Sequence, residues 1–250
     1  MTKKLEQAKQ TEKLSIVGKA AAKIAHELKN SLLMVNTFVD LLPERHQDEK
    51  FIQEFSRLIP NELQSWNEML RNMMNVAKEK PYVKKIVDFN LLIKEIGALA
   101  QFRVQQNHLE IEIDQESDLP KIKGDEQKLK QVILNLLTNS LEATPKGGKI
   151  FLKTRHVYEF GEENAGHIEV TVANTGRGIK GNRLRRIFEP FYTTKGNNLG
   201  LGLSICKEII HQHGGVIEVL SEENKGASFT VKIPTTNIKN NLFNNSFKIS

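Results

Sequence analysis

Three residues with complementary chemistry lie close together in the first part of the 250-residue chain: His26, Glu27 and Asn30. Apolar residues here recur at alternating steps of three and four, a series that includes Ile24 and Leu28 but not His26. The spacing predicts His26 on the exposed face of a helix, with Asn30 one turn further along that face. An exposed imidazole beside a carboxylate can act as a nucleophile, because the carboxylate orients the ring and takes its proton. Alone, these residues also fit a solvated histidine on a charged helix face.

Two asparagines lie four residues apart in the segment Asp125–Glu142, whose otherwise apolar pattern predicts a helix. Asn135 and Asn139 share one face of that helix. Amides among leucines contribute little to packing, but their oxygens can bind Mg²⁺, which commonly keeps waters and substrate phosphates as its other ligands. The pair therefore indicates a magnesium and phosphate site, or simply the polar side of a helix that faces solvent.

Glycines mark two further segments. Asn174–Ile179 follows a predicted strand, and its Gly176 and Gly178 permit a tight turn and a close backbone approach to a ligand. Gly200–Leu203 lies where a helix begins, so that bare amides and the positive helix end can form an anion site. Between the two, Phe188–Phe191 can anchor a loop against a core, followed by a polar stretch that we expect to be mobile. A glycine-rich turn without a ligand is the alternative in each case.

A helical hairpin must position the histidine. The seam of apolar residues over Leu14–Leu42 has the heptad spacing of helices packed in a bundle, and Pro43 is expected to end it. A second helical pattern covers Ile52–Ala77, in which Pro60 is expected to kink the helix or restart it. Each helix leaves an apolar stripe, which predicts a dimeric four-helix bundle, the alternative being packing on the chain's own second domain.

The remaining segments mix strands and helices, which predicts an α+β sandwich with helices on one side of a sheet. The expected strands are Tyr82–Asp88, Leu109–Asp114, Lys149–Val157, His167–Ala173, Val216–Leu220 and Ser228–Ile233. The expected helices are Asn90–Gln106, Asp125–Glu142 and Leu201–His213. After Pro234 the chain is rich in Asn and Lys, and we expect it to be disordered.

Composition excludes several classes of protein. The net charge of +6 is spread along the chain, apart from a cluster at Arg183, Arg185 and Arg186, which argues against a nucleic-acid binder. The single cysteine, Cys206, excludes an internal disulfide framework and a Cys-rich metal site. No apolar run approaches the about 20 residues of a membrane helix, and no signal peptide opens the chain, so we expect a cytoplasmic protein.

In their order, these segments resemble the cytoplasmic core of a bacterial two-component sensor histidine kinase over residues 14–234. Each motif is modest alone, and the order of all of them carries the resemblance. The matching segments are His26–Asn30 (phosphoacceptor box), Asn135–Glu142 (asparagine box), Asn174–Ile179 (first glycine box), Phe188–Phe191 (phenylalanine box), Gly200–Leu203 (second glycine box) and Gly226–Phe229 (closing box).

The resemblance implies an α+β fold in two parts. A helical hairpin bearing His26 would dimerise as a four-helix bundle, and an α/β sandwich of the Hsp90, gyrase and histidine kinase type would bind ATP. The implied bounds are 1–13 for the remnant of a signalling helix, 14–80 for the dimerisation and phosphotransfer domain, 81–234 for the catalytic ATP-binding domain and 235–250 for the tail.

The resemblance also implies roles for the polar residues. His26 would attack the γ-phosphate of ATP with Glu27 as base, and the phosphoryl group would pass to an aspartate of a response-regulator receiver domain. Glu27 and Asn30 would also suit dephosphorylation of that regulator. Asn139 would hold Mg²⁺, with Asn135 assisting.

The nucleotide would lie between the asparagine helix and a lid, Thr193–Leu199. The residues implied to bind it are Asn135, Asn139, Asn174, Gly176, Gly178, Thr194, Lys195, Gly200, Leu201, Gly202 and Leu203. Hydrolysing relatives place a glutamate where this chain has Asn135, which favours phosphotransfer over hydrolysis. The implied partners are a second copy of the chain and a receiver domain, and not nucleic acid.

The chain departs from the family pattern chiefly at Asn174, where an aspartate normally accepts a hydrogen bond from the adenine amino group. An amide oxygen can accept that bond without charge assistance, so we expect roughly tenfold weaker ATP binding. Smaller departures are Ser31 in place of a proline and Asn198 in place of a glycine. Two alternatives to an active kinase therefore stay open: a degenerate kinase acting as regulator phosphatase or dimeric scaffold, and an ATPase that forms no phosphohistidine.

Overall fold

The structure is a computed structural model that describes Gly18, Ala25 and residues 28–77, 82–158, 166–194 and 200–235. The chain divides into two compact units. One comprises Met1–Pro81 with Pro190–Leu201, and the other comprises Tyr82–Glu189 with Gly202–Ser250. Of the tail predicted over 235–250, all but Thr235 lies outside the described residues.

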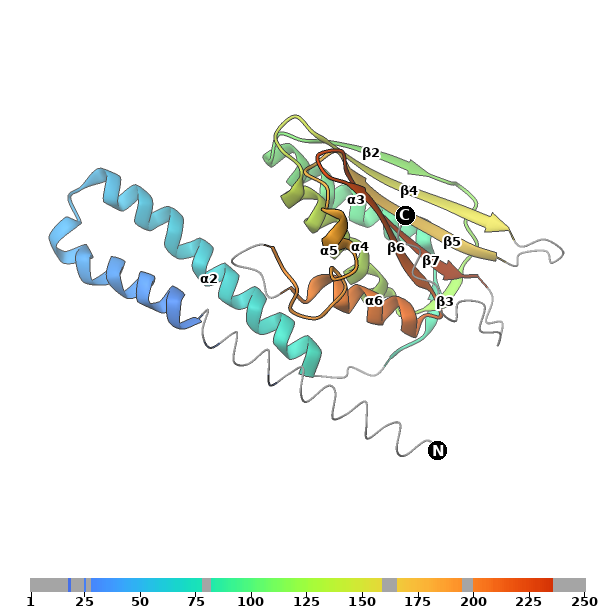
Figure 1. Ribbon diagram of the computed structural model, residues 1–250, viewed down its shortest axis with the longest axis horizontal. Coiled ribbons are helices and arrows are strands. Elements are labelled where there is room, and N and C mark those ends of the chain that lie inside the picture. The colour runs from blue at the N-terminus through green and yellow to red at the C-terminus, as the bar shows by residue number, and fades with distance from the viewer. Residues whose placement is uncertain are drawn as a thin grey trace. The chain divides into compact units, whose positions relative to one another are not determined.

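The first unit contains a helical hairpin made of a helix over residues 28–45 and α2 (Glu49–Ala77), seen in blue to cyan in Figure 1. Asp48 begins α2, because its carboxylate accepts hydrogen bonds from the backbone N–H groups of Lys50 and Phe51 at 3.1 and 3.2 Å. Phe38 of the first helix stacks on Phe51, with ring centroids 5.5 Å apart, and contacts Phe55 edge-on. These aromatic contacts hold the two helices together near the turn.

Both prolines of the hairpin lie inside helices, so the predictions that Pro43 ends the first helix and that the second helix restarts at Pro60 were wrong, whereas a kink at Pro60 stays a prediction. The first helix continues two residues beyond Pro43, and α2 runs through Pro60 as one helix of 29 residues. A proline removes only its own N–H from the hydrogen-bond ladder. Beyond Pro43, a hydrogen bond closes the turn between the two helices: the backbone N–H of Asp48 donates to the carbonyl oxygen of Arg45 at 2.9 Å.

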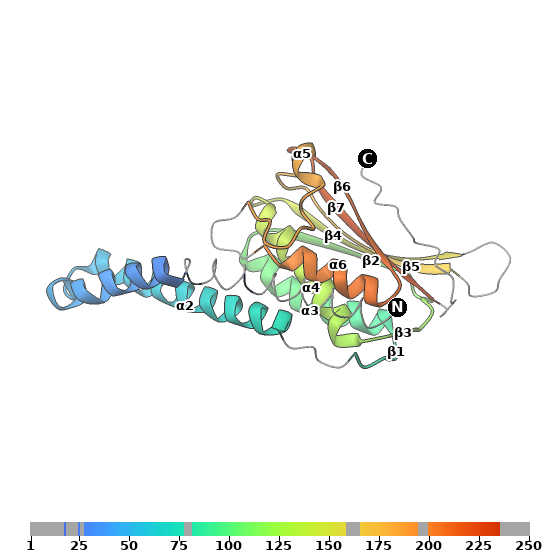
Figure 2. The same cartoon turned by 60° about the horizontal axis from the view of Figure 1, so that its bottom comes forward.

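The second unit is an α+β sandwich, as predicted. Its main sheet has the strand order β2-β4-β5-β7-β6, in which β2 and β4 are parallel and the other neighbours antiparallel. Figures 1 and 2 show the long helices α3, α4 and α6 together on one face of this sheet. The elements are β2 (Glu110–Gln115), β4 (Lys149–Tyr158), β5 (Gly166–Asn174), β7 (Gly226–Pro234), β6 (Val216–Glu222), α3 (Phe89–Gln106), α4 (Glu126–Ala143) and α6 (Gly202–Gln212).

Alternation along the strands creates the core of this sandwich. In β4, the side chains of Ile150, Leu152, Thr154 and His156 are buried, whereas those between them are more exposed. The helices supply the opposing apolar surface, including Ile133 and other fully buried residues of α4. The core therefore lies between the sheet and its three helices.

Three short elements differ from the prediction: one strand is shorter than expected, and another strand and a helix were not predicted. The strand expected over 82–88 is only β1 (Lys85–Val87), and it pairs with β3 (Ile122–Gly124) in a separate two-stranded sheet. The helix α5 (Gly181–Leu184) has four residues. Elements of three or four residues carry too little periodicity to be recognised in a sequence.

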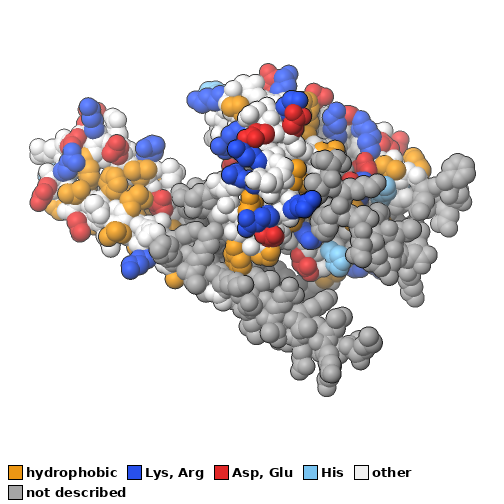
Figure 3. Space-filling view, in the orientation of Figure 1, with side chains coloured by type: hydrophobic (Ala, Val, Ile, Leu, Met, Phe, Trp, Pro, Cys, Tyr) orange, Lys and Arg blue, Asp and Glu red, His pale blue; other side chains and the backbone are white. Residues whose placement is uncertain are grey.

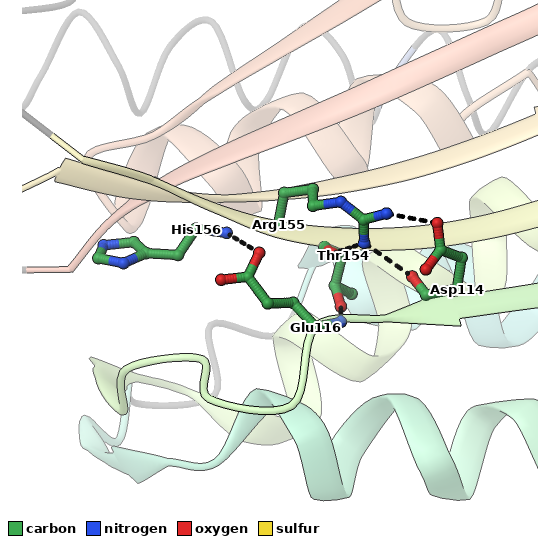
Figure 4. A network of polar contacts seen from close by, with 5 residues as sticks. All are labelled: Asp114, Glu116, Thr154, Arg155 and His156. Atoms are coloured by element: carbon green, nitrogen blue, oxygen red, sulfur yellow. Dashed lines mark hydrogen bonds and ion pairs between the residues drawn. The ribbon is translucent and has the colours of Figure 1, made fainter.

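Side chains fasten the edge strand β2 to β4 at the carboxyl ends of both strands (Figure 4). Arg155 forms an ion pair with Asp114. The backbone N–H of Glu116 donates to Thr154 Oγ1 at 3.2 Å, and the backbone N–H of His156 donates to the Glu116 carboxylate at 3.0 Å. The network thus extends the tie between the strands beyond the last pair of β2 and β4.

Candidate functional site

Asn174, the last residue of β5, is buried, and each end of its amide is hydrogen-bonded to the protein. Its Nδ2 donates to Thr144 Oγ1 at 3.0 Å, and its Oδ1 accepts from the backbone N–H of Ala227 at 3.2 Å. Thr144 in turn donates to the carbonyl oxygen of Ser140 at 2.6 Å. Because the Ala227 N–H can only donate, the orientation of the Asn174 amide is fixed. One N–H and one acceptor position of this amide remain for a ligand.

The glycines of the first glycine segment bring the surrounding backbone together. A Cβ at Gly176 would lie 2.2 Å from the Ala143 carbonyl oxygen and 2.5 Å from Asn174 Nδ2. Gly178 has a positive φ of 63°, and a Cβ there would lie 2.0 Å from the carbonyl oxygen of Glu222. Both glycines are therefore required for packing against the end of α4 and the β6–β7 turn, and their part in an adenine pocket stays a prediction.

The two asparagines of α4 have different surroundings. Asn135 is half-buried, and its Nδ2 lies 3.5 Å from the Gly202 carbonyl oxygen and 3.7 Å from Cys206 Sγ, both in α6. Asn139 is also half-buried, but its side chain makes no hydrogen bond to another described residue. The Asn139 amide oxygen is therefore free to bind an ion or a ligand, whereas Asn135 also ties α4 to α6.

The donor chemistry around Asn139 fits Mg²⁺ bound mainly through a nucleotide. Among the described residues, no group of three or more His, Cys, Asp and Glu side chains could hold a metal ion. A single amide oxygen suits an ion that keeps waters and substrate phosphates as its other ligands.

The second glycine segment opens α6. Gly202 is its first residue, and a Cβ there would meet nothing within 4 Å, so its backbone is accessible. Gly200 has a φ of 68°, and a Cβ there would lie 2.5 Å from the carbonyl oxygen of Tyr192. Leu201 is buried and Leu203 is half-buried. In this segment the backbone amides at the start of α6, and not the leucine side chains, suit phosphate binding.

The other predicted site residues are unevenly placed. Asn30 is exposed on the first hairpin helix, and Thr194 is exposed in the segment Pro190–Leu201. His26, Glu27 and Lys195 lie outside the described residues. Of the predicted set, the second unit therefore brings Asn135, Asn139, Asn174, Gly176, Gly178, Gly202 and Leu203 together on α4, α6 and the end of β5.

The sequence analysis missed Thr144, Ser140 and Ala227, which hold Asn174 in place. A hydroxyl at the end of a helix, four residues after another residue's carbonyl, is a local signal for the Thr144–Ser140 hydrogen bond. Nothing in the sequence indicates the Asn174–Ala227 contact, because these residues are 53 positions apart. Cys206 is completely buried, and burial raises the pKa of its thiol to about 12.

Comparisons with known proteins agree with this geometry. The family model described as histidine kinase-, DNA gyrase B- and HSP90-like ATPase matches residues 124–237. Sporulation kinase C of Bacillus subtilis is 33% identical over 228 residues, covering 91% of this chain and 51% of the relative. The sensor histidine kinase ZraS of Escherichia coli is 30% identical, covering 92% of this chain and 48% of the relative. The chain thus spans about half the length of these curated relatives.

A solved structure extends the similarity over both units. The histidine kinase ThkA, crystallised in complex with the response regulator TrrA, is 30% identical with a TM-score of 0.77. The match covers 94% of this chain and 67% of ThkA. Both the helical hairpin and the sandwich therefore have counterparts in one kinase, and the chain belongs to the sensor histidine kinase family, with an ATP-binding domain of the histidine kinase, gyrase B and HSP90 type in its second unit.

Proposed function

We propose that the chain is an ATP-dependent protein histidine autokinase that phosphorylates His26 and then passes the phosphoryl group to an aspartate of a response regulator. The observation that carries this proposal is the Asn139 amide, left unengaged on a helix whose neighbour α6 opens with the accessible backbone of Gly202. This pair of features suits the triphosphate of a nucleotide. The histidine, carboxylate and amide at residues 26, 27 and 30 supply the acceptor chemistry.

In this reaction Glu27 would act as the base and His26 as the nucleophile. Glu27 takes the proton from one imidazole nitrogen of His26 while the other nitrogen forms a bond to the γ-phosphorus. The bond from that phosphorus to the β–γ bridging oxygen breaks, and ADP leaves. Mg²⁺, held by Asn139 with Asn135 assisting, neutralises phosphate charge when bound.

The backbone at the start of α6, with Thr194, Lys195 and the segment around them, would bind the phosphates. Asn174 would meet the adenine amino group with the acceptor position that Ala227 leaves open. Because its other N–H cannot accept a bond from that amino group, the amide is a poorer partner than a carboxylate. This is the physical basis for expecting weak but real ATP binding.

The hairpin would act as a homodimer. Its predicted seam faces inward, since Val35, Phe38 and Leu42 are half-buried, whereas Leu32 and Val39 remain 44% and 49% exposed. Figure 3 shows apolar side chains gathered on this part of the chain. A second copy of the hairpin would cover them in a four-helix bundle.

The test uses the native chain incubated with γ-labelled Mg-ATP and then with a receiver domain encoded beside it in the genome. We expect label that is acid-labile and alkali-stable on the kinase, and then transfer of that label to the receiver. Asn139→Ala should prevent labelling, while Asn107→Ala, which truncates an asparagine at the end of α3, should not. Unlabelled, correctly folded native protein would contradict the proposal.

A second candidate function, removal of phosphate from the regulator, is favoured by the engagement of Asn174 with Thr144 and Ala227. It predicts that the chain labels itself poorly but dephosphorylates a receiver through Glu27 and Asn30. A rapid autokinase reaction with no loss of receiver phosphate would exclude it. We place both functions in the cytoplasm. Separately, none of the helices in the described part of the chain has the length and apolar character that crossing a membrane requires.

A further inference from the structure

A buried histidine joins α4 and α6 at the end of the helix pair that is remote from Asn135. His213 follows the last turn of α6 and is 9% exposed. Its Nε2 lies 3.0 Å from the backbone nitrogen of Asp125, and its Nδ1 lies 2.7 Å from the carbonyl oxygen of Ile209. Because the Asp125 N–H can only donate, Nε2 must be unprotonated and Nδ1 must carry the proton. The contacts therefore select a neutral imidazole in a single tautomer.

Asp125 completes this junction. It is the N-cap of α4, where one carboxylate oxygen accepts from the backbone N–H of Lys128 at 3.1 Å. The other oxygen accepts from the backbone N–H of Val83 at 3.3 Å. Tyr82 packs edge-on against the His213 ring, with centroids 4.9 Å apart. The junction thus joins the start of α4, the end of α6 and the segment by which the chain enters the second unit.

The groups around His213 have opposing effects on its pKa. Burial is the largest influence and lowers the pKa below its ordinary value of 6.5, and the charges of Lys84 and Lys128 act in the same direction. The α6 carbonyl and the Asp125 carboxylate act to raise it. Tyr82 carries no charge here, because burial and the nearby Asp125 raise its pKa to about 12. On balance the surroundings disfavour the charged imidazole.

The same helix pair carries the candidate nucleotide site at its other end. Because Asp125 meets His213 while Asn135 meets Gly202, α4 and α6 run antiparallel. Cys206 Sγ contacts the Val132 carbonyl oxygen between these two points. Ten residues of helix separate Asp125 from Asn135, which corresponds to about 15 Å. A change in the register of the two helices at His213 would therefore alter the spacing of Asn135 and Gly202.

We propose that His213 is a positioning residue that holds α4 and α6 in the register needed for nucleotide binding only while its imidazole is neutral, so that protonation of His213 weakens nucleotide binding. This inference rests on the nucleotide-binding function proposed above. A proton on Nε2 would face the Asp125 N–H, leaving two donors opposed, and both Asp125 carboxylate oxygens already accept backbone hydrogen bonds. Gly124 packs closely against the ring, since a Cβ at that position would lie 2.9 Å from His213 Cδ2. The charged ring must therefore displace one of its neighbours.

The sign of the effect follows from the lowered pKa. In the unfolded or locally opened chain, His213 takes up a proton near pH 6.5, whereas in the closed junction it does so only at lower pH. The stability that the neutral ring contributes is thus complete above about pH 6.5 and is lost as the pH falls below that value. By linkage, bound nucleotide must lower the pKa of His213 further.

The test measures ADP binding to the 250-residue chain by calorimetry at pH 7.5 and pH 5.5, in the native protein and in His213→Gln. Glutamine keeps an acceptor for the Asp125 N–H and a donor for the Ile209 carbonyl but does not titrate. We expect the native affinity to fall about fivefold more than that of the variant, the effect of one buried hydrogen bond. His211→Gln, which removes the exposed histidine two residues away, should retain the native pH dependence.

A second measurement does not depend on the folding of the variant. The His213 ring resonance of the native chain is titrated with and without saturating ADP, and its midpoint should move to lower pH when ADP is bound. A purely structural role would leave this midpoint unchanged, and that result would overturn the proposal. Equal pH dependence of ADP binding in native and His213→Gln protein would also overturn it, whereas an absence of ADP binding at every pH would overturn the proposed nucleotide site as well.

Discussion

The two units of the chain bury their apolar side chains to different extents. The sandwich buries an extensive core between its sheet and α3, α4 and α6, whereas Phe51 is the only fully buried apolar residue among the described side chains of the hairpin. A two-helix hairpin has only one internal seam, and the described part of this one leaves Leu32, Leu33 and Val39 largely exposed. The difference fits the proposal that a second copy of the chain covers the hairpin, whereas the sandwich buries its own core.

The largest effect should come from charging the exposed hairpin face. The double substitution Leu32→Glu/Val39→Glu places two carboxylates where a dimer would bury apolar surface. We expect a cost of about 4 kcal/mol, which is nearly a thousandfold in the dimer dissociation constant. Analytical ultracentrifugation measures it. Leu99→Glu/Phe102→Glu is the matched control, because these α3 side chains are 55% and 65% exposed but lie in the sandwich. Equal weakening of the dimer by both pairs would remove the distinction between the units.

Truncating a buried side chain of the sandwich should lower the free energy of unfolding more than truncating an exposed apolar side chain of the hairpin. Leu136→Ala removes a completely buried α4 side chain, and we expect the free energy of unfolding to fall by about 3 kcal/mol. Leu63→Ala in α2, whose side chain is 45% exposed, should cost less than about 1 kcal/mol in the isolated hairpin fold. Urea denaturation followed by circular dichroism compares the two variants. A loss for Leu63→Ala as large as that for Leu136→Ala would show that the dimer buries this residue as completely as the sandwich buries its core.

The smallest effect concerns the proposed contact between the nucleotide and Asn174, which lies in the sandwich. Asn174→Asp should bind Mg-ATP about tenfold more tightly, because a carboxylate accepts the adenine hydrogen bond with charge assistance. Calorimetric titration measures the affinity, and sedimentation should show an unchanged dimer. Equal ATP affinity of the native and substituted chains would mean that residue 174 does not accept a hydrogen bond from the adenine base.

Long periodic elements could be predicted from the sequence, and short or distant relationships could not. The helix predicted over Asp125–Glu142 is α4, Glu126–Ala143, because its apolar period and the capping aspartate are local signals. β1 was predicted as a strand but not as part of a separate sheet, because its partner β3 has only three residues. Helix continuation through Pro60 depends on the packing of the whole hairpin, which local propensity does not contain.

The candidate site divides in the same way. The spacing of Asn135 and Asn139 correctly placed both on one helix, but the contacts of Asn135 depend on α6, which begins more than sixty residues later. The restraint of Asn174 by Thr144 and Ala227, and that of His213 by Asp125, join residues 30 to 88 positions apart. Such contacts arise only when the sheet and its helices assemble, so no local pattern could indicate them.

The most direct test of the central claim is the stoichiometry of phosphohistidine after incubation with Mg-ATP, measured in the native chain, in His26→Gln and in His46→Gln. His46 lies exposed at the turn of the same hairpin and provides a matched control. We expect acid-labile phosphate on the native chain and on His46→Gln, with none on His26→Gln. Equal phosphate on His26→Gln and on the native chain would contradict it.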